Sequence, residues 1–468
     1  MCSIRKFETL NLHDDAYRTD QENSKVPFVV TAKLSEGHSN NLYGCAFNQY
    51  LDPKHTQVVA TIGHSNVTIY EVPRDVNHLI RQADYTFDGE FSHQDDMEDL
   101  YTVCWCFDTY EYAQGRNPYR VVTGGYHKQI YVLDPSTMNC VNTMSEVGNC
   151  INELRPCPTN SNLVACAVKD LTVRIFHIRN ASCLVVFGGM YCHDSQVLSV
   201  EWESNGQSLL SCGQDHLVIK WDLSKPFIQE HLSAASAALE AGEQNILNQN
   251  TAIPGKATTI NRPILKQKPR GDLNAYKASE EDAKFVTKVA EIMNQPLGCL
   301  LTVNLPFAVN NSSHGDYVDC VRQLRDSPYI FTKGCGKESR VDLWRYGVQE
   351  SETEVKMNKY GIHRNIVRLA ELQVHAGNCW FTKFDIDPRS RWLPVGSSDG
   401  KVSFFNIADP TNPSIACQLT VSKSVVRQIA FSSDGRFAVA VGDQGFVTRM
   451  DRVSVSVDPE VLAQHLKK

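Results

Sequence analysis

YCHDSQVLSVEWESNGQSLLSCGQDHLVIKWDL (residues 191–223) contains three short apolar runs that are separated by turn residues. The runs are Val197–Trp202, Ser208–Cys212 and Leu217–Trp221, and the first turn is Ser204-Asn205-Gly206. Runs of this length with Gly, Asn and Asp between them are typical of antiparallel strands joined by tight turns. The stretch therefore predicts a meander of strands.

Four residues of this stretch have the spacing of a WD40 blade, a four-stranded unit that repeats every 40–45 residues, roughly. They are His193, Asp215, Trp221 and Asp222. We expect the Asp215 carboxylate to accept hydrogen bonds from the His193 ring and from the backbone, because this would fix the tight turn. A single blade cannot form a domain, so the chain should contain further copies.

Similar units recur along the 468 residues, with a degenerate Trp-Asp dipeptide in several of them. Seven units predict an all-β fold, a closed seven-bladed WD40 β-propeller over residues 27–453. The strand-like run 27–34 precedes the first unit, so we expect it to complete the last blade and close the ring. Residues 1–26 are interpreted as a flexible N-terminal tail and residues 454–468 as a C-terminal tail. The units cover residues 43–72, 101–134, 148–178, 191–223, 315–346, 377–407 and 424–453.

Two segments interrupt the repeats. Residues 73–99 are interpreted as a long loop with an acidic end, and residues 224–314 as a long insertion between the fourth and fifth blades. Within the insertion, residues 256–277 are basic, which favours a solvated linker and leaves contact with nucleic-acid phosphate open. A helix is predicted near residues 279–293, because Ser279 can cap it, acids fill its first turn and apolar residues share one face.

The bulk composition limits the classes of function. Apolar residues make up 42% and charged residues 21% of the chain, and no apolar run approaches the roughly 20 residues that span a membrane. The net charge of −7 makes direct binding of nucleic acid weak at most. The 16 scattered cysteines, without a recognisable signal peptide, favour a reducing compartment, the cytosol or the nucleus. The cysteines have no zinc-site spacing, and we find no catalytic motif, so neither a metal nor a cofactor is expected.

One position in each unit is expected to face one mouth of the central channel. In five of the seven units it lies four residues before the aromatic residue of the first run, and the third and fifth units are aligned with these five. Large aromatic residues occupy this position in the first, second and sixth units, and Phe381 follows the last of them. These residues can either plug the channel mouth or form one binding site. The residues at this position are Tyr43, Tyr101, Asn152, Leu198, Asp319, Trp380 and Arg427.

Several aromatic faces around one point are suited to a methylated ammonium group, which keeps its charge but loses hydrogen-bond donors. Each face contributes about 0.5–2 kcal/mol, depending on desolvation. Acidic residues just before Tyr101 would favour a basic peptide around that ammonium group. They are Asp95, Asp96, Glu98 and Asp99.

The chain also contains the stretches NNLYGCAFN (40–48), LYTVCW (100–105), GNCINEL (148–154), GNCWFTKF (377–384) and VVRQIAFSSD (425–434). These stretches resemble the extra sex combs / embryonic ectoderm development family, the WD40 subunit of Polycomb repressive complex 2. The likeness extends over about residues 27–453 and suggests a divergent invertebrate member, with nematodes among the candidate sources.

The resemblance implies a non-catalytic, nuclear scaffold of a histone H3 lysine-27 methyltransferase complex that represses transcription. One face of the propeller would bind the trimethyl-lysine of the histone tail and stimulate the catalytic subunit. A helical segment of that subunit would lie on the opposite face. The resemblance implies a cage of Tyr43, Tyr101 and Phe381, with Trp380 as a further wall and with Asn152 and Arg427 near the bound peptide.

Two departures from the family are visible. The N-terminal tail is short, and the insertion 224–314 is long, which suggests a surface for a third subunit of the complex. Other hypotheses stay open. The propeller could be a scaffold only, with a vestigial cage, or it could be a substrate adaptor of another complex or a propeller enzyme.

Overall fold

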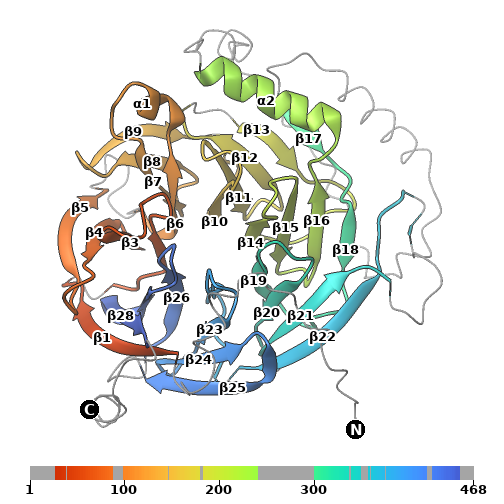
Figure 1. Cartoon of the computed structure of the whole chain (residues 1–468). Coiled ribbons are helices and arrows are strands. Elements are labelled where there is room, and N and C mark those ends of the chain that lie inside the picture. Colours follow the sequence, from red (N-terminus) through yellow and green to blue (C-terminus); the bar gives the residue numbers. More distant parts are fainter. Residues whose placement is uncertain are drawn as a thin grey trace.

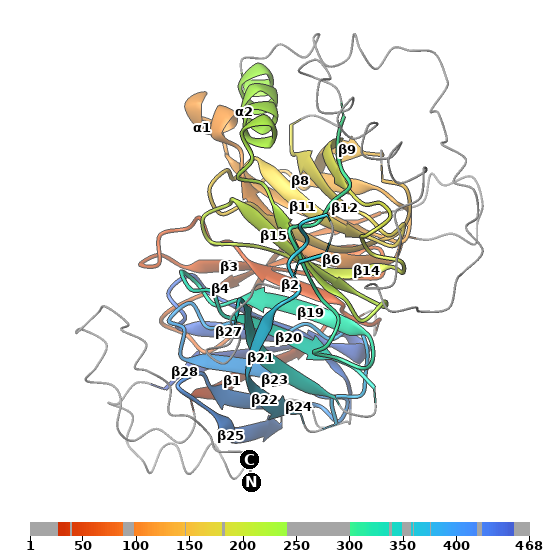
Figure 2. The ribbon, with the colours of Figure 1, turned by 90° about the vertical axis from the view of Figure 1, so that its right-hand side faces the viewer.

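The protein is described by a computed structural model that covers residues 27–37, 40–87, 98–145, 147–179, 183–240, 300–336, 339–348, 357–358, 360–374, 376–418 and 424–453. In these residues the strands form seven sheets, and Figure 1 shows the sheets side by side around a closed ring. Two α-helices, α1 (Thr109–Ala113) and α2 (Pro226–Glu240), lie on the same side of the ring in both views (Figures 1 and 2). The fold is therefore an all-β propeller with short helical additions.

Three sheets come from the first part of the chain, and each meanders outward from its innermost strand. The first contains β2 (Gly44–Phe47), β3 (Gln57–Gly63), β4 (Asn66–Val72) and β5 (Ile80–Thr86). The second contains β6 (Leu100–Phe107), β7 (Tyr119–Gly125), β8 (Ile130–Asp134) and β9 (Asn139–Met144). The third contains β10 (Ile151–Pro156), β11 (Leu163–Val168), β12 (Val173–His177), β13 (Cys183–Phe187) and β17 (Leu301–Val303).

Four sheets follow. One contains β14 (Val197–Trp202), β15 (Ser208–Gly213), β16 (Val218–Asp222) and β18 (Ala308–Asn310), and the next β19 (Val318–Gln323), β20 (Ile330–Gly334), β21 (Arg340–Tyr346) and β22 (Ile366–Gln373). A three-stranded sheet contains β23 (Trp392–Gly396), β24 (Lys401–Asn406) and β25 (Asp409–Gln418). The last contains β26 (Val426–Phe431), β27 (Phe437–Gly442), β28 (Phe446–Arg452) and β1 (Phe28–Ser35), and the 3₁₀ turn η3 (Asp443–Gly445) joins β27 to β28.

The ring closes between the two ends of the described chain. β1 pairs antiparallel with β28, from Phe28 opposite Arg452 to Ser35 opposite Phe446. This confirms the prediction that the run 27–34 completes the last sheet. An N-terminal strand beside a C-terminal one leaves no open edge between the first and last sheets, so the ends of the chain hold the ring together.

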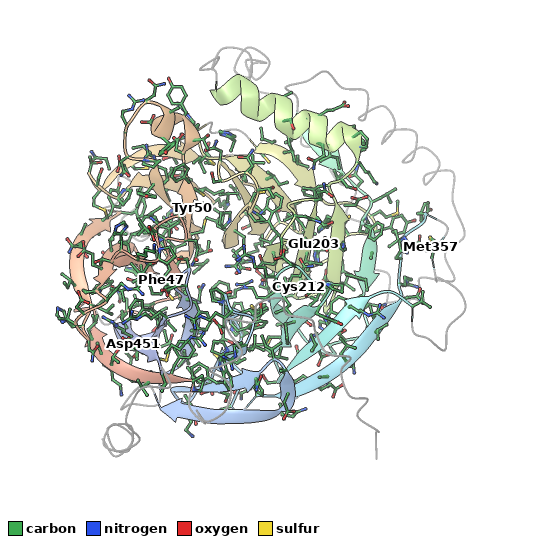
Figure 3. All side chains as sticks on the ribbon, viewed as in Figure 1. Phe47, Tyr50, Glu203, Cys212, Met357 and Asp451 are labelled. Carbon is green, nitrogen blue, oxygen red and sulfur yellow. The ribbon has the colours of Figure 1, made fainter. Side chains whose placement is uncertain are left out.

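Apolar side chains fill the space between neighbouring sheets. One buried cluster, for example, joins β2–β4 to β26–β28 through Leu42, Phe47, Val59 and Val439. Figure 3 shows such side chains throughout the ring, with Phe47 and Cys212 on opposite sides of the centre. Indole groups add hydrogen bonds between sheets, since Trp105 Nε1 donates to the Ala46 carbonyl at 2.8 Å and Trp202 Nε1 to the Arg155 carbonyl at 3.0 Å.

The sheet of β14, β15, β16 and β18 contains a buried hydrogen-bond chain that fixes its turns. His193 Nδ1 lies 2.8 Å from Asp215 Oδ2, and His193 Nε2 lies 2.7 Å from the Ser211 hydroxyl, which also accepts from Trp221 Nε1 at 2.9 Å. The backbone NH groups of Asp194 and Leu217 donate to Asp215. Asp222 caps the following turn by accepting from the Ser224 NH at 2.9 Å. The WD40 signature residues thus act through hydrogen bonds inside one blade.

The prediction that residues 73–99 form one long loop is partly wrong. Ile80–Thr86 forms β5, the outer strand of the first sheet, and pairs with β4. The sequence does not predict this strand, because its side chains are mostly exposed and mostly polar, so it shows no apolar alternation. This outer strand supplies hydrogen-bond partners for the backbone groups along the free edge of β4.

The insertion 224–314 is shorter than expected. It begins with α2, and its last part returns to the ring as β17, which extends the third sheet in parallel beside β13, and as β18, which pairs with β16. α2 packs on the same region, since Ile228 and Leu232 are buried and His231 Nε2 lies 3.0 Å from the Leu184 carbonyl of β13. The helix predicted near 279–293 lies outside the described residues.

Candidate functional site

The sequence alignment of the seven units places equivalent residues at one end of the inner strands. Each of Tyr101, Asn152, Leu198, Asp319 and Arg427 is the second residue of its inner strand, at a point where the pairing register shifts by one residue. Tyr43 directly precedes β2. A β-bulge leaves one residue without an opposite partner and redirects its side chain, so these residues form a ring around one end of the inner strands.

Three aromatic rings meet on this ring of residues. The centroids of Tyr43 and Tyr101 are 5.5 Å apart, those of Tyr43 and Phe381 5.9 Å, and those of Tyr101 and Phe381 5.7 Å. The corresponding interplanar angles are 88°, 85° and 70°. Edge-to-face contacts at these distances are favourable. The three planes are almost mutually perpendicular, like three walls that meet at a corner.

Trp380 and Phe381 lie in an irregular segment before β23. Among the described sheets, only the sheet of β23, β24 and β25 has no regular inner strand. Trp380 is 50% exposed and meets only the edge of Phe381 among the ring contacts of the described residues, at 5.8 Å and 73°. Phe381 is 6% exposed and has a φ of 60°, which is uncommon for a bulky residue. The backbone conformation of Phe381 turns its ring inward, toward Tyr43 and Tyr101.

Two cations already face the aromatic group. The Arg427 guanidinium carbon lies 5.4 Å from the Tyr43 ring centroid, and Lys383 Nζ lies 5.2 Å from that of Phe381. Arg427 also forms a bidentate ion pair with Asp443, at 2.7 and 2.9 Å, and donates to the Trp380 carbonyl at 3.2 Å. Burial alone would lower the pKa of Arg427, but Asp443 raises it. Most of the guanidinium group of Arg427 is already bonded to partners within the protein. Contact between Arg427 and a peptide stays a prediction.

Asn152 is buried, and its amide nitrogen donates to the Val197 carbonyl at 2.7 Å. The acidic stretch before Tyr101 is divided. Asp95 and Asp96 lie outside the described residues, and Asp99 is half-buried beside Tyr101, where burial raises its pKa.

Glu98 was expected to face a peptide, and this expectation is wrong. Glu98 is fully buried, accepts from the Tyr131 hydroxyl at 2.8 Å and from the His127 NH at 3.1 Å, and burial raises its pKa. Glu98 therefore stabilises the second sheet, because it accepts hydrogen bonds from a strand of that sheet and from the turn before it. Glu36 does the same in the first sheet, where it accepts from Thr61 and Tyr70.

A group of buried charges that the sequence does not predict lies between the inner strands. Glu153 of β10 lies 2.6 Å from Arg322 of β19, and the Val200 NH donates to it at 3.0 Å. Lys383 Nζ donates to the carbonyl oxygens of Leu198 and Asp319, each at 2.6 Å. The sequence signal that could have indicated this group is the presence of single charged residues inside apolar strand runs. These contacts join four neighbouring inner segments around the axis.

Neither metal sites nor membrane-spanning helices are found in the part of the chain that the structure describes. No group of three or more His, Cys, Asp or Glu side chains there is placed to hold a metal ion. No helix in the same residues is long and apolar enough to cross a membrane.

Comparisons with known proteins agree with the propeller fold. The family model "WD domain, G-beta repeat" matches residues 182–222, which include the hydrogen-bond chain of His193. The Polycomb protein mes-6 of Caenorhabditis elegans is 41% identical over 98% of this chain and 99% of its own length. The chain belongs to the esc/mes-6 family of Polycomb proteins. The Polycomb protein esc of Drosophila melanogaster is a more distant relative of this Polycomb protein, 25% identical over 92% of this chain and 85% of its own.

Solved structures show the same fold at low sequence identity. A chain from a humanized mutant of the Chaetomium thermophilum Polycomb Repressive Complex 2 superposes with a TM-score of 0.66 and 15% identity, covering 92% of this Polycomb protein and 99% of that chain. A chain from the same organism's complex "with H3K27me3 and H3K27M" gives 0.63 and 14%, over 92% and 98%. These likenesses establish the WD40 propeller architecture.

Proposed function

We propose that this protein is the propeller subunit of a Polycomb repressive complex 2 and that it binds the trimethylated lysine 27 of a histone H3 tail. The observation that carries the proposal is the corner formed by Tyr43, Tyr101 and Phe381, with Trp380 exposed at its rim. Three near-perpendicular faces give a methylated ammonium group π surface from three directions, which a single stacked pair cannot do.

In this role the protein is a nuclear scaffold without catalytic activity. It supports and stimulates a catalytic methyltransferase subunit, and a helical segment of that subunit lies on the face opposite the aromatic corner. Transcriptional repression follows from the modification of histone H3. We infer that each of the seven sheets is one blade and that the insertion within 224–314 offers a surface to a third subunit. The net charge of −7 supports a minor role for nucleic acid.

The flanks of the peptide would lie along the rim of bulged residues. Asp99, beside Tyr101, supplies negative charge to a basic tail, and Asp95 and Asp96 would extend it. Asn152 and Arg427 remain candidates for contact with the peptide backbone through their least committed atoms.

A scaffold with a vestigial site is the second candidate. It is favoured by the cations of Arg427 and Lys383, which already occupy positions over Tyr43 and Phe381. An internal cation on one ring face reduces what an incoming ammonium group can gain there, if both use the same face.

A reconstituted complex separates the two candidates. This chain is combined with its catalytic subunit, and methyl transfer to histone H3 is measured with added trimethyl-lysine-27 peptide or with the unmodified peptide. A reader predicts stimulation by the trimethylated peptide alone. A complex that forms and methylates but responds equally to both peptides supports the vestigial site instead.

A further inference from the structure

The segment Cys379–Lys383 carries two of the four aromatic residues, but it has almost no regular backbone pairing. Its only bridge in the described residues joins Lys383 to Gln428, where the Lys383 NH donates to the Arg427 carbonyl at 2.7 Å. The segment also holds the left-handed backbone of Phe381. Backbone strain of this kind persists only when surrounding contacts impose it, so other groups must hold the segment.

An ion pair from the following sheet contacts this segment on one side. Arg427 of β26 and Asp443 of η3 form two parallel N–H···O bonds, and the same guanidinium group donates to the Trp380 carbonyl at 3.2 Å. The guanidinium carbon lies over the Tyr43 ring as well. Arg427 therefore joins Trp380 and Tyr43, and Asp443 fixes the orientation of Arg427.

A second ion pair, from the preceding sheet, contacts the segment on the other side. Lys333 Nζ lies 3.1 Å from both carboxylate oxygens of Asp319, and both side chains are fully buried. Lys333 also donates to the Cys379 carbonyl at 3.5 Å, and Asp319 accepts from the Thr382 NH at 3.3 Å. A buried pair is costly unless its remaining valences are satisfied, and here the backbone of the segment satisfies them.

We propose that Arg427–Asp443 and Lys333–Asp319 are positioning pairs that replace the missing strand hydrogen bonds and hold Trp380 and Phe381 against Tyr43 and Tyr101. The proposal rests on the proposed function for its effect on binding, but the positioning itself is independent of any ligand. Neither Asp443 nor Lys333 belongs to the residues that the sequence singles out for binding. Lys333 acts on the backbone carbonyl of residue 379, and Asp443 acts on that of residue 380 through Arg427.

The direct test is Asp443→Asn, with two readouts. The chain is labelled with 5-fluorotryptophan, and the Trp380 fluorine resonance is assigned with Trp380→Phe. The variant should shift or broaden this resonance, and it should weaken binding of the trimethylated histone H3 peptide by about tenfold. Asp434→Asn is the matched control, because Asp434 pairs with Arg74 at 3.2 Å with similar exposure but lies at the other end of β27.

The buried pair is tested by the combined change Asp319→Asn and Lys333→Met, which removes both charges and leaves none unpaired. It should disturb the Trp380 resonance in the same way. If Asp443→Asn weakens peptide binding while the Trp380 resonance stays that of the wild type, the pair acts on the peptide directly and the proposal is overturned. An unchanged resonance together with unchanged binding overturns it as well. A disturbed resonance in a wild-type background that binds no peptide supports the positioning pairs and contradicts only the proposed function.

Discussion

The ring of Tyr43, rather than its hydroxyl group, is the part that the site uses. Its edge and face contact Tyr101, Phe381 and Arg427, and all three contacts are made by the aromatic ring. Sequence patterns place Tyr43, Tyr101 and Trp380 at equivalent positions, because strand repeats fix their register. They do not predict the left-handed backbone of Phe381, since nothing local in the sequence requires it.

Tyr43→Phe should therefore bind trimethylated histone H3 peptide within about twofold of the wild type, while Tyr43→Ala should bind about tenfold more weakly. The physical reason is that phenylalanine keeps the π face and alanine removes it. Isothermal titration of both variants provides the measurement. Equal losses in both would show that the hydroxyl group, and not the ring, carries the interaction.

At the scale of the element, one hydroxyl group connects two signature residues of the fourth sheet. The Ser211 hydroxyl contacts His193 Nε2 and accepts from Trp221 Nε1, and all three side chains are buried. A buried donor that loses its acceptor keeps the cost of desolvation.

Ser211→Ala should lower the free energy of unfolding by about 1–3 kcal/mol, because it leaves the Trp221 indole NH and one nitrogen of His193 unpaired. Urea denaturation measures this change. Ser195→Ala is the control, since Ser195 lies in the same blade and, among the described residues, its hydroxyl contacts only Gln214, at 3.3 Å. A stability equal to that of the control would contradict the role given to Ser211.

The sequence predicts the inner and middle strands far better than the outer ones. β14 and β15 are rich in apolar residues because both of their faces are buried between sheets. β5 and β18 were not predicted, and they lie in segments that the sequence indicates to be a loop and an insertion. The reason is that outer strands are short or exposed and lack a periodic pattern. Glu98 was misassigned for a related reason, since burial of an acid is decided by tertiary partners such as Tyr131.

At the scale of the molecule, buried charges connect strands that are far apart in the sequence. Burial alone would raise the pKa of Glu153, but Arg322, Lys383 and Arg155 lower it from the usual 4.5 to about 2. A carboxyl group whose pKa is lower in the folded state stabilises the fold above its unfolded pKa, and this contribution is lost as the pH falls from about 4.5 toward 2. No sequence pattern predicts this pair, because Glu153 and Arg322 are 169 residues apart.

Glu153→Gln should lower the free energy of unfolding at pH 7 by about 3–5 kcal/mol, because it leaves the buried Arg322 without its charge partner. The variant should also lose less additional stability than the wild type between pH 4.5 and 2. Denaturant unfolding across this pH range measures both effects. Asp326→Asn, which removes an exposed ion pair with Arg325, should change stability by less than about 0.5 kcal/mol at any pH. Parallel pH profiles for the wild type and Glu153→Gln would contradict this account.

The most direct test of the central claim is a titration of trimethyl-lysine-27 histone H3 peptide into the wild type and Tyr101→Ala, with the unmodified peptide in parallel. Tyr112→Ala, which changes a 66% exposed tyrosine on α1 that is no part of the aromatic corner, is the control. We expect the wild type and the control to bind the trimethylated peptide with a Kd on the order of 10–100 μM, and Tyr101→Ala to bind about tenfold more weakly. Equal affinity of the wild type for the two peptides, or an unaltered Kd in Tyr101→Ala, would contradict the claim that Tyr43, Tyr101 and Phe381 form a methyl-lysine site.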